Sequence, residues 1–183
     1  MRGIAATVSN PRTEAQMNQR AKFSAVLKFL QPLTPFLRIG FKNYAVGMTA
    51  FNAAMSINIQ NALTGTYPLY AIDYSKALIS RGNLPGALNS VATSVIPGEI
   101  EYTWNNNSDD TNAMPDDKVI LIVVNPAKFQ AVTLVGGNTR AAGSDTITLP
   151  ASFVGDEVQC YIAFQNATQS VLSNSQFVSH LVV

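Results

Sequence analysis

The spacing of hydrophobic residues changes along the chain, and its first segment has the spacing of a strand. Ile4, Ala6 and Val8 alternate with small or polar residues, which is the period of a half-buried β-strand. The pair Asn10-Pro11 ends this segment, because proline has no N–H to donate to a ladder. The sequence therefore predicts an apolar strand at the very start of the chain.

Three helices are expected next, over residues 14–30, 35–47 and 50–63. Thr13 opens a capping box before the first, and Thr49 is the expected cap of the third. Each helix carries an apolar stripe at helical spacing, which we expect to pack on the rest of the fold. The stripe residues are Phe23, Leu27, Leu30, Phe36, Leu37, Phe41, Tyr44, Phe51, Met55, Ile59 and Ala62.

The pattern becomes strand-like after the third helix. Tyr67–Tyr74 and Lys76–Ser80 are expected to be strands or an extended crossing, and the turn-rich segment Arg81–Gly86 marks a domain boundary. Short apolar segments then alternate with turn residues. The seven strands expected there are Ser90–Ile96, Glu99–Trp104, Lys118–Asn125, Phe129–Leu134, Asp145–Leu149, Glu157–Phe164 and Ser175–Val183.

Seven short strands in about 95 residues are typical of an immunoglobulin-like sandwich. The predicted fold class is α+β: an N-terminal extended strand plus helical region over residues 1–86, then an all-β sandwich over residues 87–183. Val119–Val124 is apolar without interruption, as expected for a strand buried between layers. Gly136-Gly137 is expected to form a hairpin turn, since glycine readily adopts positive φ.

Several segments of the C-terminal half have the pattern of one sandwich family. Trp104 lies on the second expected strand, Leu149–Tyr161 has the form of a crossing into a sixth strand, and Gln165–Ala167 precedes Leu172–Ser175 as in a final hairpin. In these features the half resembles fibronectin type III domains. The resemblance implies a fold and carries no activity.

Four other segments are similar to a second family, over the helical half and the boundary. They are Asn10–Gln16, Gln19–Phe23, Gly65–Pro68 and Ser80–Gly86. With them the whole chain resembles an uncharacterised bacterial domain-of-unknown-function family. This resemblance likewise implies a fold and no function.

Charge is low for a chain of this size, and it changes the list of expected partners. Charged residues make up 13% of the sequence against a usual share of roughly 25%, and the net charge is +1. Without a clustered basic face, nucleic acid is not an expected partner. No apolar run reaches the roughly 18 residues of a membrane span or resembles a signal-peptide core. Export would therefore use another route, or a signal that has been removed or replaced.

The residues that catalysis would need are few. His180 and Cys160 are the only histidine and the only cysteine, and they are expected on neighbouring strands. Cys160 alternates with the apolar residues of its strand, which favours a role in the core. Glu99 and Glu101 alternate outward on a strand, as a solvated face does. The sequence therefore predicts a protein that is not an enzyme and has no cofactor.

Two groups of residues suggest binding, each with a plainer alternative. The loop Asn105–Asp117 is rich in the carboxylate and amide oxygens that Ca²⁺ prefers, although its spacing matches no EF-hand and a solvated loop explains it equally. Tyr67, Tyr70, Tyr74 and Tyr161 can form an aromatic platform for sugars. They can also pack between the two halves of the chain.

These observations favour a structural subunit of a homo-oligomeric assembly, either an extracellular filament or a virion or injection-device component. Its partners would be other copies of itself, and Ile4, Ala6 and Val8 are the expected subunit contact, because an isolated strand has unpaired backbone groups. The alternative is a surface- or carbohydrate-binding accessory module that recognises a glycan or a protein. Either role would place the protein outside the cell, at the cell surface or on a virion.

Overall fold

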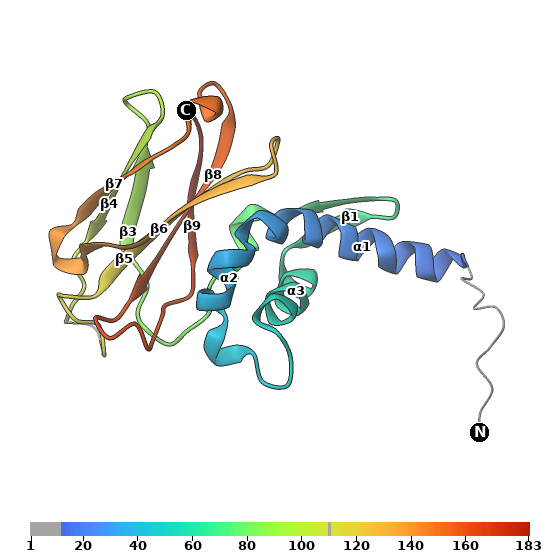
Figure 1. The fold of residues 1–183 in the computed structure, drawn as a ribbon, viewed down its shortest axis with the longest axis horizontal. Coiled ribbons are helices and arrows are strands. Elements are labelled where there is room, and N and C mark those ends of the chain that lie inside the picture. The colour runs from blue at the N-terminus through green and yellow to red at the C-terminus, as the bar shows by residue number, and fades with distance from the viewer. Residues whose placement is uncertain (1–11, 110) are drawn as a thin grey trace.

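The computed structural model describes residues 12–109 and 111–183 (Figure 1). The predicted strand with Ile4, Ala6 and Val8 lies outside the described residues. The α-helices are α1 (Glu14–Leu30), α2 (Thr34–Gly40) and α3 (Ala50–Asn61). The strands are β1 (Leu63–Thr66), β2 (Leu69–Ile72), β3 (Leu88–Thr93), β4 (Glu99–Asn105), β5 (Lys118–Asn125), β6 (Gln130–Thr139), β7 (Ser144–Thr148), β8 (Glu157–Gln165) and β9 (Gln176–Val182).

The α+β class is confirmed, but the expected division into three helices is not. A 3₁₀ turn at Gln31–Leu33 joins α1 to α2, so that the two form one helical run of 27 residues. Pro32 stands in the first turn of that 3₁₀ segment, where a missing N–H costs little. The caps are as predicted, since Thr13 accepts from the Gln16 N–H and Thr49 from the Asn52 N–H.

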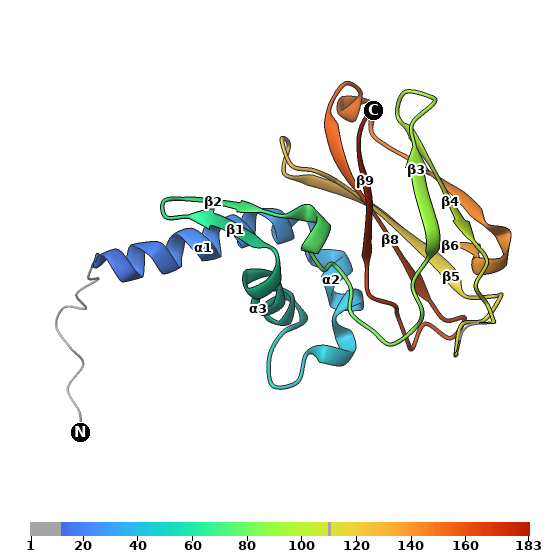
Figure 2. The same cartoon turned by 180° about the vertical axis from the view of Figure 1, so that it is seen from behind.

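Each of the seven strands expected after residue 87 is present, within a few residues of its expected bounds. They form a three-stranded sheet in the order β3-β4-β7 and a four-stranded sheet in the order β6-β5-β8-β9, with antiparallel pairing throughout. The two sheets face each other as a sandwich (Figures 1 and 2). The sandwich expected from the strand pattern is confirmed.

The central strands of the four-stranded sheet, β5 and β8, are buried on both faces. Val119, Leu121 and Val123 of β5 belong to the core between the two sheets. Ile120 and Ile122 belong to a second core, shared with the helices on the other side. This arrangement explains why β5 is apolar from Val119 to Val124 and why its limits were predicted correctly.

The boundary segment between the halves is bonded to both of them. The Arg81 N–H donates to the Gly40 carbonyl in α2, and the Leu84 N–H donates to the Leu172 carbonyl beside β9. A Cβ atom on Gly82 would lie 1.8 Å from the Leu172 oxygen, so the chain passes here at a distance that only glycine permits. The segment therefore holds the helices against the sandwich.

Two predictions about turns are wrong. Tyr67 and Pro68 form the turn of the β1–β2 hairpin instead of beginning a strand, because Thr66 and Leu69 on either side of them pair with each other. Gly136-Gly137 is not a turn, because β6 continues through both residues. The positive φ of Gly136 lies where the β5–β6 register shifts, so it serves a bulge.

Candidate binding and contact sites

The structure keeps Cys160 and His180 apart. They lie on neighbouring strands, where Cys160 pairs in register with Ser179, the residue before His180. Successive side chains on a strand point to opposite faces, so Cys160 is buried in the core and His180 is exposed. Burial raises the pKa of the Cys160 thiol to about 11, which keeps it neutral near pH 7.

The loop Asn105–Asp117 ends in a carboxylate that already has a cationic partner. Asp117 is buried and accepts from Arg140 Nε at 3.0 Å and from the Met114 N–H at 2.9 Å. Asn107 accepts from Arg140 Nη1 at 2.7 Å. The described part of the loop contributes to no cluster of three or more metal-binding side chains. Asn107 and Asp117 of this loop thus both accept hydrogen bonds from the Arg140 side chain.

Tyr74 and Tyr161 pack between the helical half and the sandwich. This is one of the two roles expected for the four tyrosines. Tyr161 on β8 is buried and donates its hydroxyl hydrogen to the Tyr74 carbonyl at 2.8 Å. The ring of Tyr74 contacts Phe29 of α1, with 5.7 Å between centroids. Burial raises the pKa of the Tyr161 and Tyr74 phenols, so both stay protonated and neutral.

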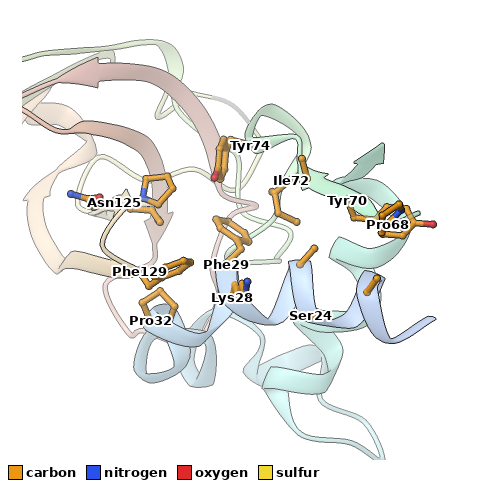
Figure 3. A pocket seen from close by; sticks show the side chains of 15 residues that line it. Ser24, Lys28, Phe29, Pro32, Pro68, Tyr70, Ile72, Tyr74, Asn125 and Phe129 are labelled. Carbon is orange, nitrogen blue, oxygen red and sulfur yellow. The ribbon is translucent and has the colours of Figure 1, made fainter. Parts of the chain in front are cut away.

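Tyr70 and Tyr74 also line a cavity of about 460 Å³ where the helices meet the sandwich, and this size suits a small ligand. Figure 3 shows Asn125 and Phe129 at one end, Pro68 and Tyr70 at the other, and Ser24 and Lys28 of α1 between them. The lining residues come from α1 and the 3₁₀ turn that follows it, from the β1–β2 hairpin and the segment after it, and from the end of β5 with the β5–β6 turn. They are Ala21, Ser24, Ala25, Lys28, Phe29, Pro32, Pro68, Tyr70, Ala71, Ile72, Tyr74, Val124, Asn125, Pro126 and Phe129.

The turn that carries Phe129 is held in place by polar contacts. Asn125 accepts from the Lys128 N–H at 3.0 Å and donates to Asp156 Oδ2 at 2.7 Å. Lys128 Nζ contacts both the Ser152 carbonyl and the Asp156 carboxylate. The hydrogen bond from Lys128 to Asp156 is the main reason why the pKa of Asp156 is lowered. A positive φ of 52° at Phe129 presents its ring to solvent, 58% exposed.

A second groove, of about 870 Å³, lies between α1 and α3. Its apolar lining includes Phe23, Leu27 and Met48, which are 47%, 43% and 50% exposed. The expectation that Phe23 and Leu27 lie on the packed face of α1 is therefore wrong. That face consists of Val26, Phe29 and Leu30, which pack in one core with residues of α2, α3 and β5.

Among residues 12–109 and 111–183, the strand β3 forms one edge of the three-stranded sheet, since it pairs there only with β4. Leu88 and Val91 on this strand are 46% and 52% exposed, and Val95 and Ile96, which follow it, are 83% and 59% exposed. An exposed apolar edge is a template for pairing with another chain. Sequence reasoning missed it, because these residues have the same alternation as buried strand residues.

Residues 1–179 match the model of a family described as a family of unknown function, DUF6266. The chain belongs to this family. The resemblance to an uncharacterised family is thus confirmed. Among solved structures, the fn3 domain of the human collagen alpha-1(XX) chain is similar at 9% identity and a TM-score of 0.41, over 55% of this chain and 86% of that chain. No curated protein matches the chain.

No helix among the described residues is long and apolar enough to cross a membrane.

Proposed function

We propose that this protein is a non-enzymatic structural subunit that assembles with other copies of itself. The N-terminal segment with Ile4, Ala6 and Val8 pairs with the exposed edge strand β3 of the next copy. The observation that carries this proposal is the position of that edge relative to the start of α1.

Figures 1 and 2 place the start of α1 at one end of the molecule and β3 in the sheet farthest from the helices. A segment that precedes α1 therefore emerges far from the β3 strand of its own chain. Strand pairing is then favoured between copies. Such a contact joins two different surfaces, and repeated head-to-tail contacts of this kind build rings or open filaments.

The chemistry of the two surfaces also supports pairing. An edge strand has N–H and C=O groups without ladder partners, and an added strand satisfies them. Val91 lies on the outer face of β3, with Val95 and Ile96 beyond the end of the strand. The apolar side chains at Ile4, Ala6 and Val8 would cover part of that surface.

A low surface charge favours assembly into a filament, a virion or an injection device. With a net charge of +1, copies repel one another weakly. We place such an assembly outside the cell, at its surface or on a virion. The burial of Cys160 and its separation from His180 support a non-enzymatic role.

Sedimentation velocity of matched strand variants tests the proposal. Serine at Ile4, Ala6 and Val8 together removes the apolar face, while Ala5→Ser with Thr7→Ser changes only the other face of the same strand. We expect the wild type and the second variant to sediment as assemblies and the first as a monomer. Assemblies of unchanged size in the first variant would contradict the proposal.

A second candidate function is a carbohydrate-binding accessory module, and one observation favours it: Tyr70, Tyr74 and the exposed Phe129 line one cavity. Aromatic faces with a few polar groups suit sugar rings. A glycan array with Tyr70→Ala as the comparison tests this role. Binding that the variant loses supports it, and an array without binding rejects it.

A further inference from the structure

We infer that the cavity between α1, β2 and the β5–β6 turn binds an acidic saccharide, with Lys28 pairing with a uronic acid carboxylate and Phe129 stacking on a sugar ring. This inference rests on the second candidate function and names its ligand class. The cavity is a different surface from the β3 edge, so this inference and the assembly proposal are tested independently.

Charge selects an anion for this site. Lys28 is exposed on α1, borders the cavity and has no ion-pair or hydrogen-bond partner among residues 12–109 and 111–183. A second cation is close, since Lys22 Nζ lies 5.6 Å from the centroid of the Tyr70 ring. None of the described residues that line the cavity carries a carboxylate. An ammonium group without a partner beside a concave surface favours a ligand with a negative charge.

Two of the acidic groups near the cavity are already paired with lysines, and a third, Glu157, accepts from Gln159 Nε2 at 3.1 Å. Asp73, next to Tyr74 in the chain, forms an ion pair with Lys76 at 2.9 Å. Asp156, which accepts from Asn125, is paired with Lys128. The hydrogen bond from the Ser75 hydroxyl, and after it the contact with Lys76, lowers the pKa of Asp73, and the hydrogen bond from Lys128 lowers the pKa of Asp156. Neither Asp73 nor Asp156 is therefore available to neutralise Lys28.

The exposed aromatic ring of Phe129 favours a sugar over a simple anion. Phe129 keeps its ring exposed on a turn that Asn125 and Lys128 fix, so little ordering remains to be done when a ligand stacks on it. A second hollow of about 520 Å³ adjoins this cavity, and Lys28, Pro32 and Phe129 line both of them. Figure 3 shows the ring of Phe129 beside Pro32.

The site is elongated, which favours an oligosaccharide over a single sugar. Phe129 lies at one end and Tyr70 at the other, with Ser24 and Lys28 between them (Figure 3). The Ser24 hydroxyl is exposed on α1, one turn before Lys28, and can hydrogen-bond a ring substituent beside the carboxylate. Aromatic rings at the two ends would contact different rings of one chain.

Calorimetric titration with two matched probes tests the inference on the full chain. The probes are trigalacturonic acid and its fully methyl-esterified form, which keeps the rings and removes the charge. We expect the acid to bind at least about tenfold more tightly than the ester, as a charge-assisted hydrogen bond implies. Higher salt should reduce that difference.

Variants assign the effect to residues. Lys28→Met keeps the length of the side chain and should lower affinity for the acid about tenfold without changing affinity for the ester. Phe129→Asn removes the ring at a position where asparagine tolerates positive φ, and it should weaken both probes. Lys42→Met, on an exposed lysine that does not line the cavity, should change neither.

The outcomes separate the inference from the function on which it rests. Equal binding of acid and ester, or an unchanged affinity in Lys28→Met, overturns the acidic ligand and leaves carbohydrate binding in place. Absence of binding by both probes and by every glycan on an array overturns both. Binding that survives in Phe129→Asn overturns this cavity as the site.

Discussion

Arg140 and Asp117 form an ion pair inside the sandwich. Arg140 Nε lies 3.0 Å from Asp117 Oδ2, and the side chains are 0% and 1% exposed. The Arg140 side chain also donates to the Pro85 carbonyl at 2.9 Å and to the Gly86 carbonyl at 3.1 Å, and its Cζ atom lies 3.8 Å from the centroid of the Phe164 ring. One arginine thus connects the boundary segment, the loop before β5 and the core.

Arg140→Met should destabilise the protein strongly, because it leaves the Asp117 carboxylate buried without a cation. Removing one partner of a buried pair typically costs about 3–5 kcal/mol. Urea denaturation followed by tryptophan fluorescence measures it, since Trp104 Nε1 donates to the Arg140 carbonyl at 2.8 Å. Lys76→Met, which breaks an exposed pair with Asp73, is the control and should leave the midpoint unchanged. An equal loss in both variants would contradict this role for Arg140.

Stability should fall above pH 9 because of Cys160. Its pKa rises from 9.0 to about 11 on folding, chiefly through burial. The raised value means that this stabilisation is fully present below pH 9 and is lost as pH rises from 9 to 11, amounting to about 2–3 kcal/mol. Urea midpoints at pH 7, 9 and 10.5 measure the decline. Cys160→Ala should show a shallower decline, whereas an unchanged slope would exclude the thiol as its source.

Gly82→Ala should disrupt the junction of the two halves. The added Cβ atom would lie 1.8 Å from the Leu172 carbonyl oxygen, so the chain must move and lose the Leu84–Leu172 hydrogen bond. We expect a loss of about 2–4 kcal/mol in the free energy of unfolding. Gly47→Asn is the control, because the site is open and asparagine tolerates its φ of +69°. A melting temperature for Gly82→Ala equal to that of the control would show that the junction is not tightly packed.

The sandwich was predictable because its strands have strong local patterns. Val119–Val124 is buried on both faces and is therefore apolar without interruption. Ile100, Tyr102 and Trp104 are buried and alternate with more exposed residues, so their strand was identified by its alternation. The glycines at 136 and 137 misled the prediction, because positive φ serves a bulge as readily as a turn. Phe23 and Leu27 misled it as well, since an apolar stripe does not reveal whether anything covers it.

The candidate cavity was not predictable from the sequence beyond the tyrosines. Its walls come from Ser24 and Lys28 of α1, Tyr70 of β2 and Phe129 of the β5–β6 turn, which lie up to about a hundred residues apart. Lys28 reads as an ordinary cation in the last turn of a helix, and Phe129 as the start of a strand. Only the packing of the helices on the sandwich brings them together.

Disulfide trapping between two copies tests the assembly most directly. One chain carries Val8→Cys and a second, differently tagged chain carries Val91→Cys, while the native Cys160 stays buried. We expect a mixed disulfide between the two tagged chains under native conditions, and much less when Val135→Cys on the edge strand β6 replaces Val91→Cys. Equal trapping at Val91 and Val135, or no mixed disulfide at all, would contradict pairing of the N-terminal strand with β3.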